Sequence, residues 1–196
     1  MFTGVVQALG RLRSSRTGEV EIEFPPTLRG PLAVGESIAV NGICLTARAV
    51  HDGAFRADIS RETATRTTLG SLRPGQRVNL ELPLRPEDGL DGHLVLGHVD
   101  AVGRIQALYR KERDWIAILS VPTATVQYVV EKGSVAVDGI SLTSYGLDGN
   151  AFRCSIIPET YERTTMQDRT SGDPVNVEFD ILAKYVERMM PFVHHD

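Results

Sequence analysis

The sequence contains few of the residues and segments that cross-link a protein or anchor it in a membrane. Its 196 residues include two cysteines, Cys44 and Cys154, which are too few for a disulfide framework and lack the spacing of metal ligands. No run of 18 apolar residues occurs, and the first twelve residues lack the charged and apolar regions of a signal peptide. We therefore expect a protein of the reducing cytoplasm that is neither exported nor membrane-spanning.

An excess of charge of one sign is also lacking. Lysine and arginine number 21 against 25 aspartates and glutamates, a formal charge of -4, and no basic cluster is denser than residues 11–16. Nucleic-acid-binding proteins usually carry a basic face, so we expect no nucleic-acid partner. Apolar residues make up 42% and charged residues 23%, the proportions of an ordinary globular protein. Small molecules or other proteins are the expected partners.

What the sequence does contain is an internal repeat. At an offset of 97, residues 37–46 (SIAVNGICLT) and 134–143 (SVAVDGISLT) are identical at seven of ten positions. The register holds over residues 55–68 and 152–165, which are identical at eight of fourteen positions. Near the start of each unit the offset is 93, where Gly4 aligns with Gly97. Such self-similarity indicates a duplicated structural unit.

The repeated positions are of two kinds. Alternating apolar residues and glycines recur for packing alone, without any site. Polar residues recur as well, in the pairs Asn41/Asp138, Thr46/Thr143, Glu62/Glu159, Thr63/Thr160 and Arg66/Arg163. We therefore predict two similar domains, residues 1–92 and 93–180, each with its own version of one pocket. A tail of residues 181–196 follows.

Within a unit, short stretches rich in Val, Ile and Thr are separated by turn residues about every 10 positions, which is typical of a small barrel or sandwich. In the first unit these stretches are residues 18–24, 37–40, 43–47, 55–59 and 77–82. Asn41-Gly42 and Asp138-Gly139 each lie between two such stretches. Both pairs predict a tight hairpin, because its two central residues need a positive φ.

Helices are expected at few places. Residues 62–69 and 159–166 are repeated candidates, and residues 125–132 form a third that Gly133 would end. The segment 179–190 spaces its apolar residues along one stripe, which predicts an amphipathic helix that Pro191 ends. This helix packs on its own domain or binds another subunit.

Two of the five histidines, His93 and His98, lie at the boundary between the units. On a strand, a separation of five puts the two rings on opposite faces, and no carboxylate or cysteine stands at ligand spacing, so we expect no metal site. An alternative is that each histidine only hydrogen-bonds the end of a strand. For His194 and His195, in the polar tail, we expect no specific role.

Cys44 aligns with Ser141, so a nucleophilic or hydrogen-bonding group stands at the same place in each unit. A buried cysteine usually fills the core. Here Thr46 and Thr143 follow two residues later on the same strand face, and together these groups suit a planar heterocycle with edge amides. Because Asn41 differs from Asp138 and Cys44 from Ser141, the two pockets would handle similar ligands differently, which suggests a reaction between two like molecules.

No other catalytic motif competes with this interpretation. The sequence has no phosphate-binding loop, no dinucleotide-binding fingerprint after a strand, no G-x-S-x-G and no H-E-x-x-H.

Five motifs resemble those of riboflavin synthase of the alpha-chain type, a family with the lumazine-binding repeat. They are MFTGVVQ at residues 1–7, NGICLT at 41–46, GHLVLGHVD at 92–100, DGISLT at 138–143 and AKYVER at 183–188. The resemblance covers the whole chain. It implies an all-β fold of two tandem six-stranded Greek-key barrels with a C-terminal α-helix, and a homotrimer in which that helix makes the contact.

The resemblance also implies the reaction. Two molecules of 6,7-dimethyl-8-ribityllumazine would exchange a four-carbon unit and give riboflavin and 5-amino-6-ribitylaminouracil, the last step of riboflavin biosynthesis, with no cofactor. The enzyme would be a transferase. Association with the lumazine-forming synthase is a further partnership that the sequence leaves open.

In this family the active site forms between the N-terminal barrel of one chain and the C-terminal barrel of a neighbour. The contacts that the resemblance implies for the first barrel are Gly4, Val5, Val6, Cys44, Leu45, Thr46, Asp58, Ile59, Ser60, Arg61, Glu62 and Thr63. Those that it implies for the second barrel are Gly97, His98, Val99, Lys132, Ser141, Leu142, Thr143, Ile156, Ile157, Pro158, Glu159, Thr160 and Tyr161.

The catalytic roles follow from the same resemblance. His98 is the candidate for transferring the proton of the lumazine C7 methyl group, because an unperturbed imidazole titrates near neutrality. Ser141, assisted by Asp138, would orient or supply the oxygen that adds at C7. Cys44 would line the opposing pocket and Phe2 would close over the shared site. His93 completes the candidate catalytic set.

Two other hypotheses remain at this point. A lumazine or flavin antenna protein would share the duplicated fold and bind a chromophore without converting it, but such proteins typically lose the histidines, Asp138 and Ser141 that this chain keeps. A structural or interaction module would leave the repeated polar residues unexplained. Leu96, Asp91 and the Ser60-Arg61 pair depart from the family pattern, and we expect them to change packing around the first pocket rather than its chemistry.

Overall fold

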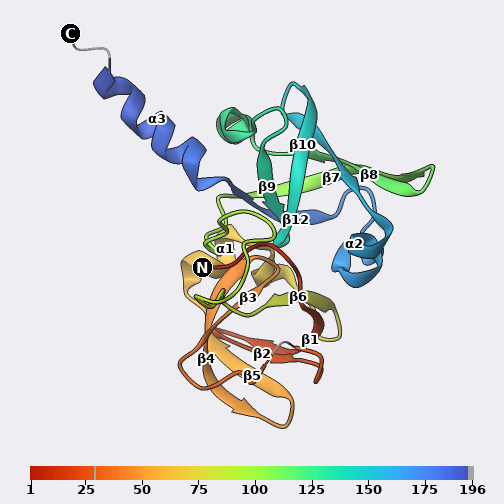
Figure 1. Cartoon of the computed structure of the whole chain (residues 1–196). Helices are drawn as coiled ribbons and strands as arrows, with labels where there is room; N and C mark the ends of the chain where they lie inside the picture. The colour runs from red at the N-terminus through yellow and green to blue at the C-terminus, as the bar shows by residue number, and fades with distance from the viewer. Residues whose placement is uncertain (29, 194–196) are drawn as a thin grey trace.

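In the computed structural model, residues 1–28 and 30–193 are described, residues 191–193 by their backbone alone. His194 and His195 lie outside the described residues. The chain forms two barrels, one above the other in Figure 1, with a helix that projects from the second barrel at the C-terminal end. Among the described residues, no helix has both the length and the apolar character needed to cross a bilayer.

The first barrel is closed by six antiparallel strands in the order β1-β2-β5-β4-β3-β6. Their bounds are β1 (Ala8–Arg16), β2 (Glu19–Glu23), β3 (Ser37–Val40), β4 (Ile43–His51), β5 (Ala54–Asp58) and β6 (Arg77–Glu81). The second barrel repeats this topology with β7 (Ala101–Lys111), β8 (Asp114–Ser120), β9 (Ser134–Val137), β10 (Ile140–Asp148), β11 (Ala151–Ile156) and β12 (Pro174–Phe179). The predicted fold class of two six-stranded barrels is therefore confirmed.

Strand β1 is absent from the stretches that hydrophobic patterning predicts. Its inward positions are Ala8, Gly10 and Leu12, so two of three carry almost no apolar side chain. Position 10 requires glycine, because a Cβ there would lie 2.6 Å from the Leu80 side chain and 2.7 Å from the Glu23 carbonyl oxygen. Close packing against the neighbouring strands β2 and β6 thus removes the alternating signal that a strand usually shows.

The helical segments are short and mostly follow β5 and β11. They are α1 (Arg61–Arg66), η1 (Thr68–Ser71), η2 (Thr123–Tyr128), α2 (Pro158–Arg163), η3 (Thr165–Asp168) and α3 (Ile181–Val193), where η marks a 3-10 helix. The predicted helix over 125–132 is wrong in type and extent, because the chain is extended at Val129 and Lys132 has a positive φ of 64°. The prediction that Pro191 ends the last helix is also wrong. Proline removes one backbone hydrogen bond, and α3 continues to Val193 despite it.

The two barrels meet at the predicted hairpins. Asn41 and Asp138 have φ of 45° and 47°, and the following glycines, Gly42 and Gly139, are also at positive φ. The two turns touch, since a Cβ on either glycine would lie 2.7 Å from the backbone nitrogen of the other. Only glycine fits at these positions, because any side chain would separate the barrels.

Buried amides extend this contact with a twofold-like pattern. The Nδ2 atom of Asn79 on β6 donates to the Asp138 carbonyl at 2.9 Å, and that of Asn176 on β12 donates to the Asn41 carbonyl at 2.9 Å. Each Oδ1 accepts from a backbone N–H of the opposite repeat, Thr165 for Asn79 and Thr68 for Asn176, at 2.8 Å. Both amides are almost fully buried, so these bonds set how the barrels are joined.

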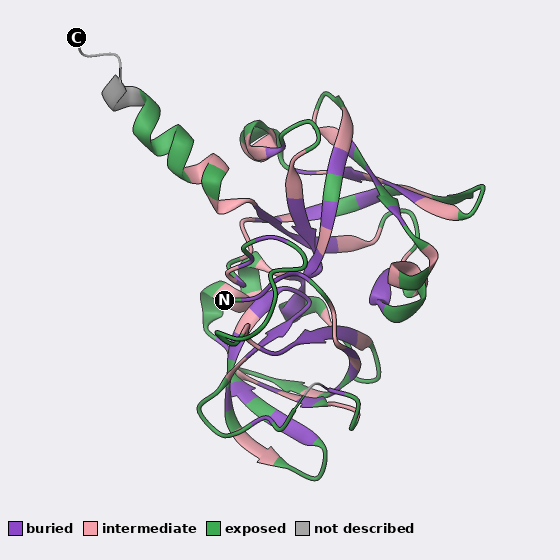
Figure 2. Cartoon of the chain, viewed as in Figure 1, coloured by how far each residue is buried: buried purple, intermediate pink, exposed green. Residues whose placement is uncertain are grey.

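Each barrel has its own apolar core, and many residues along the strands are buried, purple in Figure 2. A third, smaller cluster lies between the barrels and comprises Phe2, Ala39, Val95 and Ala136, with Cys44 against it. The N-terminal segment is therefore part of the contact between the barrels.

Candidate functional site

Two extended segments cross from one barrel to the other. The Ser141 N–H on β10 donates to the Gly4 carbonyl at 2.8 Å, and the Cys44 N–H on β4 donates to the Gly97 carbonyl at 2.9 Å. A Cβ on Gly4 would lie 2.7 Å from the Ser141 Cβ, and one on Gly97 would lie 2.5 Å from the Cys44 Cβ. The resemblance assigns Gly4 to the first barrel and Gly97 to the second, and these contacts reverse that assignment. Gly4 lies against the second barrel and Gly97 against the first.

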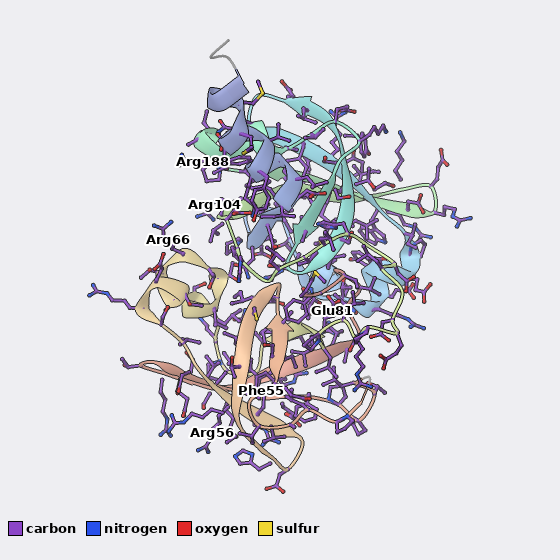
Figure 3. The ribbon with its side chains drawn as sticks, turned by 60° about the vertical axis from the view of Figure 1, so that its left-hand side comes forward. Phe55, Arg56, Arg66, Glu81, Arg104 and Arg188 are labelled. Atoms are coloured by element: carbon purple, nitrogen blue, oxygen red, sulfur yellow. The ribbon has the colours of Figure 1, made fainter. Side chains whose placement is uncertain are left out.

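Two buried glutamates hold these crossing segments. The Glu81 carboxylate, where the barrels meet in Figure 3, accepts from the Thr3 N–H at 2.7 Å, the Thr3 hydroxyl at 2.8 Å and the Gly4 N–H at 3.0 Å. The Glu178 carboxylate accepts from the N–H groups of Leu96, Gly97 and His98 at 2.6 to 3.0 Å. Each carboxylate thus fixes one crossing segment. In both cases the glutamate belongs to one barrel and the segment lies against the other.

Burial governs the ionisation of both glutamates. It raises the pKa of Glu178 to about 6, although three N–H groups and Lys184 favour the charged form. Burial also raises the pKa of Glu81, against the hydrogen bonds from Thr3 and Gly4. The crossing segments are therefore held by carboxylates that titrate closer to neutrality than exposed ones.

His93 and Ser141 form a hydrogen-bonded pair at the second barrel. The Nδ1 atom of His93 lies 2.7 Å from the Ser141 Oγ. His93 is 7% exposed, and burial lowers its pKa, with an opposing effect of the Asp180 charge. A neutral imidazole with Nδ1 facing a hydroxyl can accept the hydroxyl proton, so this geometry suits a base beside a nucleophile. The buried Nε2 atom has no partner among the described residues.

His98 lies at the other barrel. It follows Gly97, which packs on Cys44, and its side chain is exposed. At an offset of 93 its repeat counterpart is Val5, which lines a cavity beside Ser141. Within one chain, His98 therefore lies beside the first barrel, while His93 contacts Ser141 of the second barrel.

Asp138, expected to assist Ser141, hydrogen-bonds other groups instead. Its carboxylate is fully buried, and both oxygens are occupied, one by the Asn176 N–H at 2.8 Å and the other by the Arg169 guanidinium at 2.6 Å. In the first repeat Asn41 accepts the equivalent N–H, from Asn79, and Leu72 stands where Arg169 does. The second repeat therefore has the ion pair Asp138–Arg169 where the first repeat has a neutral amide, Asn41, and a leucine, Leu72.

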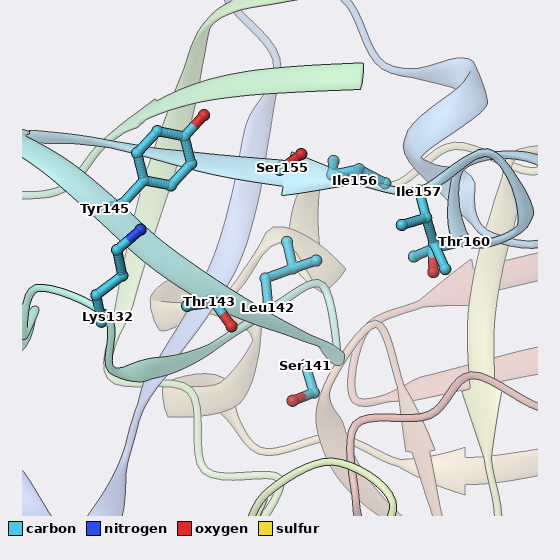
Figure 4. A pocket seen from close by; sticks show the side chains of 9 residues that line it. All are labelled: Lys132, Ser141, Leu142, Thr143, Tyr145, Ser155, Ile156, Ile157 and Thr160. Atoms are coloured by element: carbon cyan, nitrogen blue, oxygen red, sulfur yellow. The ribbon is translucent and has the colours of Figure 1, made fainter. Parts of the chain in front are cut away.

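A cavity of about 560 Å³ opens on the second barrel (Figure 4). Seven expected residues line it, Lys132, Ser141, Leu142, Thr143, Ile156, Ile157 and Thr160, and two that sequence reasoning missed, Tyr145 and Ser155. Tyr145 could have been found from its place two residues after Thr143 on the same strand face. Lys132 Nζ lies 5.0 Å from the centre of the Tyr145 ring.

A second cavity of about 320 Å³ adjoins the first, with Ser141 and Thr160 lining both. The expected residues Gly4, Val5, Val6 and Glu159 line it, together with Asp91 and Gly92. Tyr161 is among the expected contacts but stacks on Trp115 instead, and Pro158 begins α2 outside the lining. The second-barrel site thus comprises two cavities that share Ser141 and Thr160 as lining residues.

The equivalent residues of the first barrel are arranged differently. Cys44 is half-buried and Thr46 is exposed, as are their counterparts Ser141 and Thr143, so the difference lies in the residues around them. Asp58 pairs with Arg48 at 2.9 Å, where the second barrel has Ser155 and Tyr145. Ser60 caps α1 by accepting from the Thr63 N–H. The expected contacts Leu45 and Ile59 belong to the first-barrel core, while Arg61 and Glu62 are exposed in the first turn of α1.

Phe2 occupies a place other than the expected one. Its side chain is fully buried in the cluster between the barrels, and its N–H donates to the Val95 carbonyl at 2.7 Å. Within the chain it anchors the crossing segment rather than covering a pocket. Among the residues that the structure describes, no three His, Cys, Asp or Glu side chains gather as metal ligands would.

Comparison with known proteins gives close relatives over almost the whole chain. The family model for the lumazine binding domain matches residues 3–83 and again 96–180. Riboflavin synthase of Mycobacterium tuberculosis is 46% identical and covers 97% of this chain and 98% of its own. Riboflavin synthase of Photobacterium phosphoreum is 39% identical, over 97% of this chain and 89% of its own.

Solved structures agree on the fold. LumP complexed with riboflavin superimposes with a TM-score of 0.83 at 23% identity, over 91% of this chain and 99% of the other. LumP complexed with 6,7-dimethyl-8-(1'-D-ribityl) lumazine gives 0.82 at 21% identity, with the same coverage. At this identity the likeness shows the architecture alone. Together with the full-length sequence relatives, these matches show that the chain belongs to the lumazine-binding-domain family and, within it, to the riboflavin synthases.

Proposed function

We propose that the protein is a transferase that makes riboflavin from two molecules of 6,7-dimethyl-8-ribityllumazine. One lumazine gives up a four-carbon unit and leaves as 5-amino-6-ribitylaminouracil, while the other gains it. The observation that carries the proposal is the His93–Ser141 pair, in which Ser141 lines two cavities. A binding protein would need the hollow but not a neutral imidazole beside a hydroxyl.

The first chemical task is to activate the acceptor lumazine. As the Ser141 oxygen adds at C7, its proton passes to His93 Nδ1, whose pKa burial lowers so that the neutral, proton-accepting form is favoured. The second task is to remove a proton from the C7 methyl group of the donor. Its anion delocalises into the pyrimidinedione, so a modest base suffices, and the exposed His98 beside the first barrel is our candidate.

We place the reacting centre between two chains. The first barrel and the second barrel of one chain each carry part of the machinery, His98 and Cys44 on one, His93 and Ser141 on the other. Helix α3 supports an assembly, because it projects from the barrel and exposes Leu182, Val186 and Met189 at about 60% (Figure 2). A trimer held by α3 would bury this face and bring unlike barrels together.

The trimer is tested by replacing Leu182 and Val186 with glutamate. Sedimentation should show monomers, with turnover lost while lumazine still binds. A double variant that stays trimeric would contradict the proposed contact. Lys111→Glu, on an exposed strand end, is the control for added negative charge. We place the protein in the cytoplasm, where its substrate would be made, and docking to lumazine synthase stays a prediction without structural support.

A non-catalytic antenna is the rival function, since LumP shares the fold. It is disfavoured because this chain keeps His93, His98, Cys44 and Ser141. Incubation of the purified protein with the lumazine decides between them. Growth of riboflavin absorbance with release of the aminouracil supports the transferase. Stoichiometric binding without product supports the antenna.

A further inference from the structure

Helices α1 and α2 occupy equivalent places in the two repeats but are held by different contacts. In α1, the Ser60 Oγ accepts from the Thr63 N–H at 2.9 Å and lies 2.8 Å from the Thr63 hydroxyl. At the start of α2, Ile157 stands in place of Ser60 and makes no capping hydrogen bond. Because Ile157 has no hydroxyl, it cannot hydrogen-bond the hydroxyl of Thr160, which is the counterpart of Thr63.

A stacked aromatic pair holds α2 instead. The rings of Trp115 on β8 and Tyr161 on α2 have centroids 3.9 Å apart and planes within 6° of each other. Both side chains are half-buried and pack against the core of the second barrel. Stacked aromatic pairs stabilise a contact beyond the area that they bury. The stack therefore ties the helix to the strand beneath it.

The first repeat has no such pair. Trp115 is the strand partner of Ile156, and the equivalent of Ile156, Ile59, donates its N–H to Gly18. The counterpart of Tyr161 is Ala64. With glycine and alanine at these places, α1 can be held only by its cap and its own core contacts.

The first turn of α2 is also a wall of the 560 Å³ cavity. Ile157 and Thr160 line it from the α2 side, opposite Ser141 and Thr143 on β10 (Figure 4). Ile157 is 51% exposed, a large fraction for an isoleucine in a well-packed domain. The apolar side chain of Ile157 and the hydroxyl of Thr160, which bonds no capping residue, thus line the same cavity. Such a lining suits a ring that is apolar on its face and polar at its edge.

We infer that the Trp115–Tyr161 stack positions the first turn of α2, so that Ile157 and Thr160 form the wall of the second-barrel pocket before a ligand arrives. A wall that is already ordered avoids the entropy cost of ordering it on binding. Tyr161 is a positioning residue and touches no reacting atom. The inference rests on the proposed function, because the ligand of the pocket is taken to be the lumazine.

The test uses the full-length protein and three variants. Tyr161→Ala installs the residue of the first repeat, Tyr161→Phe keeps the stack without the hydroxyl, and Tyr109→Ala removes an exposed tyrosine elsewhere. Lumazine is titrated while the emission of Trp115, the single tryptophan, is followed, and KM and kcat are measured. Tyr161→Ala should weaken binding and raise KM roughly three- to tenfold, the range expected for losing an aromatic pair, with kcat within about twofold. Tyr161→Phe and Tyr109→Ala should bind like the parent.

Unchanged lumazine affinity in Tyr161→Ala, with only a lower melting temperature, would show that the stack is merely structural and would overturn the inference. If Tyr161→Ala does not fold, Tyr161→Leu keeps apolar volume without a ring and is judged by the same titration. A parent protein that binds lumazine but forms no riboflavin would refute the proposed function alone, since the dissociation constants still decide the role of the stack. A parent protein that binds no lumazine would refute both.

Discussion

The Nδ1 atom of His93 lies 2.7 Å from the Ser141 hydroxyl oxygen, and burial lowers the pKa of the imidazole. The sequence places these residues 48 positions apart, in an irregular segment and on β10. Their pairing depends on Glu81, which fixes Thr3 and Gly4, because the Thr3 carbonyl in turn accepts the His93 N–H at 3.1 Å. The His93–Ser141 pair is thus positioned by a carboxylate of the other barrel.

Loss of either member of the pair should lower turnover. We expect His93→Ala and Ser141→Ala each to reduce kcat by about 10²- to 10⁴-fold, the usual contribution of general acid–base catalysis, with smaller changes in KM. Because the two groups act as a unit, the double variant should be little worse than either single one. Steady-state assays of riboflavin formation measure this, with His51→Ala, at the exposed end of β4, as the control. Independent, multiplying losses would contradict the pairing.

The buried ion pair Asp138–Arg169 provides a second prediction. Asp138→Asn should destabilise the protein by roughly 3 kcal/mol, because it leaves the Arg169 charge buried without a partner. The double variant Asp138→Asn, Arg169→Leu recreates the Asn41 and Leu72 arrangement of the first repeat and should recover most of that loss. Urea unfolding measures both. If the double variant is stable but its turnover falls more than 100-fold, Asp138 has a chemical role that the structure does not show.

The crossing glycines should tolerate no side chain. Gly97→Ala puts a Cβ 2.5 Å from the Cys44 Cβ at a φ of 80°, so we expect a loss of about 2 to 4 kcal/mol from strain and overpacking together. Gly172→Ala is the matched control, because its φ is 94° but no atom lies within 4 Å of the added Cβ. It should cost clearly less in the same urea titration. Equal losses would mean that backbone strain alone, and not the contact with Cys44, requires glycine at position 97.

Glu178 should make stability depend on pH in a defined direction. Burial raises its pKa from 4.5 to about 6 in the folded state, so the folded protein binds the proton more tightly than the unfolded chain. Its contribution is therefore fully present below about pH 4.5 and is lost as the pH rises through 6, a change of about 2 kcal/mol.

Comparison with Glu178→Gln isolates this contribution, since glutamine does not titrate and other groups cancel. The unfolding free energy of the parent, relative to that of the variant, should increase between pH 7.5 and pH 4.5. A difference that is flat or falls over that range would show that the three N–H groups, rather than burial, dominate the ionisation of Glu178.

Much of the architecture follows from local signals. The hairpins at Asn41-Gly42 and Asp138-Gly139 were predictable, because the turn needs two residues at positive φ and the flanking stretches alternate. Most of the second-barrel pocket was also predictable, because Ser141 and Thr143 share a strand face. Strand β1 was not, because Gly10 and Ala8 replace apolar side chains where the barrel packs tightly.

The residues that belong to each site could not be predicted from the sequence in the same way. The resemblance groups Gly4 with Cys44 and Gly97 with Ser141, whereas in the structure Gly4 contacts Ser141 and Gly97 contacts Cys44. Segments 2–6 and 95–99 have no periodicity, so nothing local tells which barrel they lie against. The answer depends on Glu81 and Glu178, whose carboxylates meet these segments from strands that lie about 80 residues away in sequence.

By itself, the sequence determined the duplication, the two barrels and the polar groups that recur in each, because repeats, alternation and turn residues act over a few positions. Only the tertiary structure decided which histidine meets Ser141, that Asp138 binds Arg169 instead, and that a Trp115–Tyr161 stack holds one helix where a serine cap holds the other. These are contacts between distant segments, and burial and packing, rather than local preference, select among them.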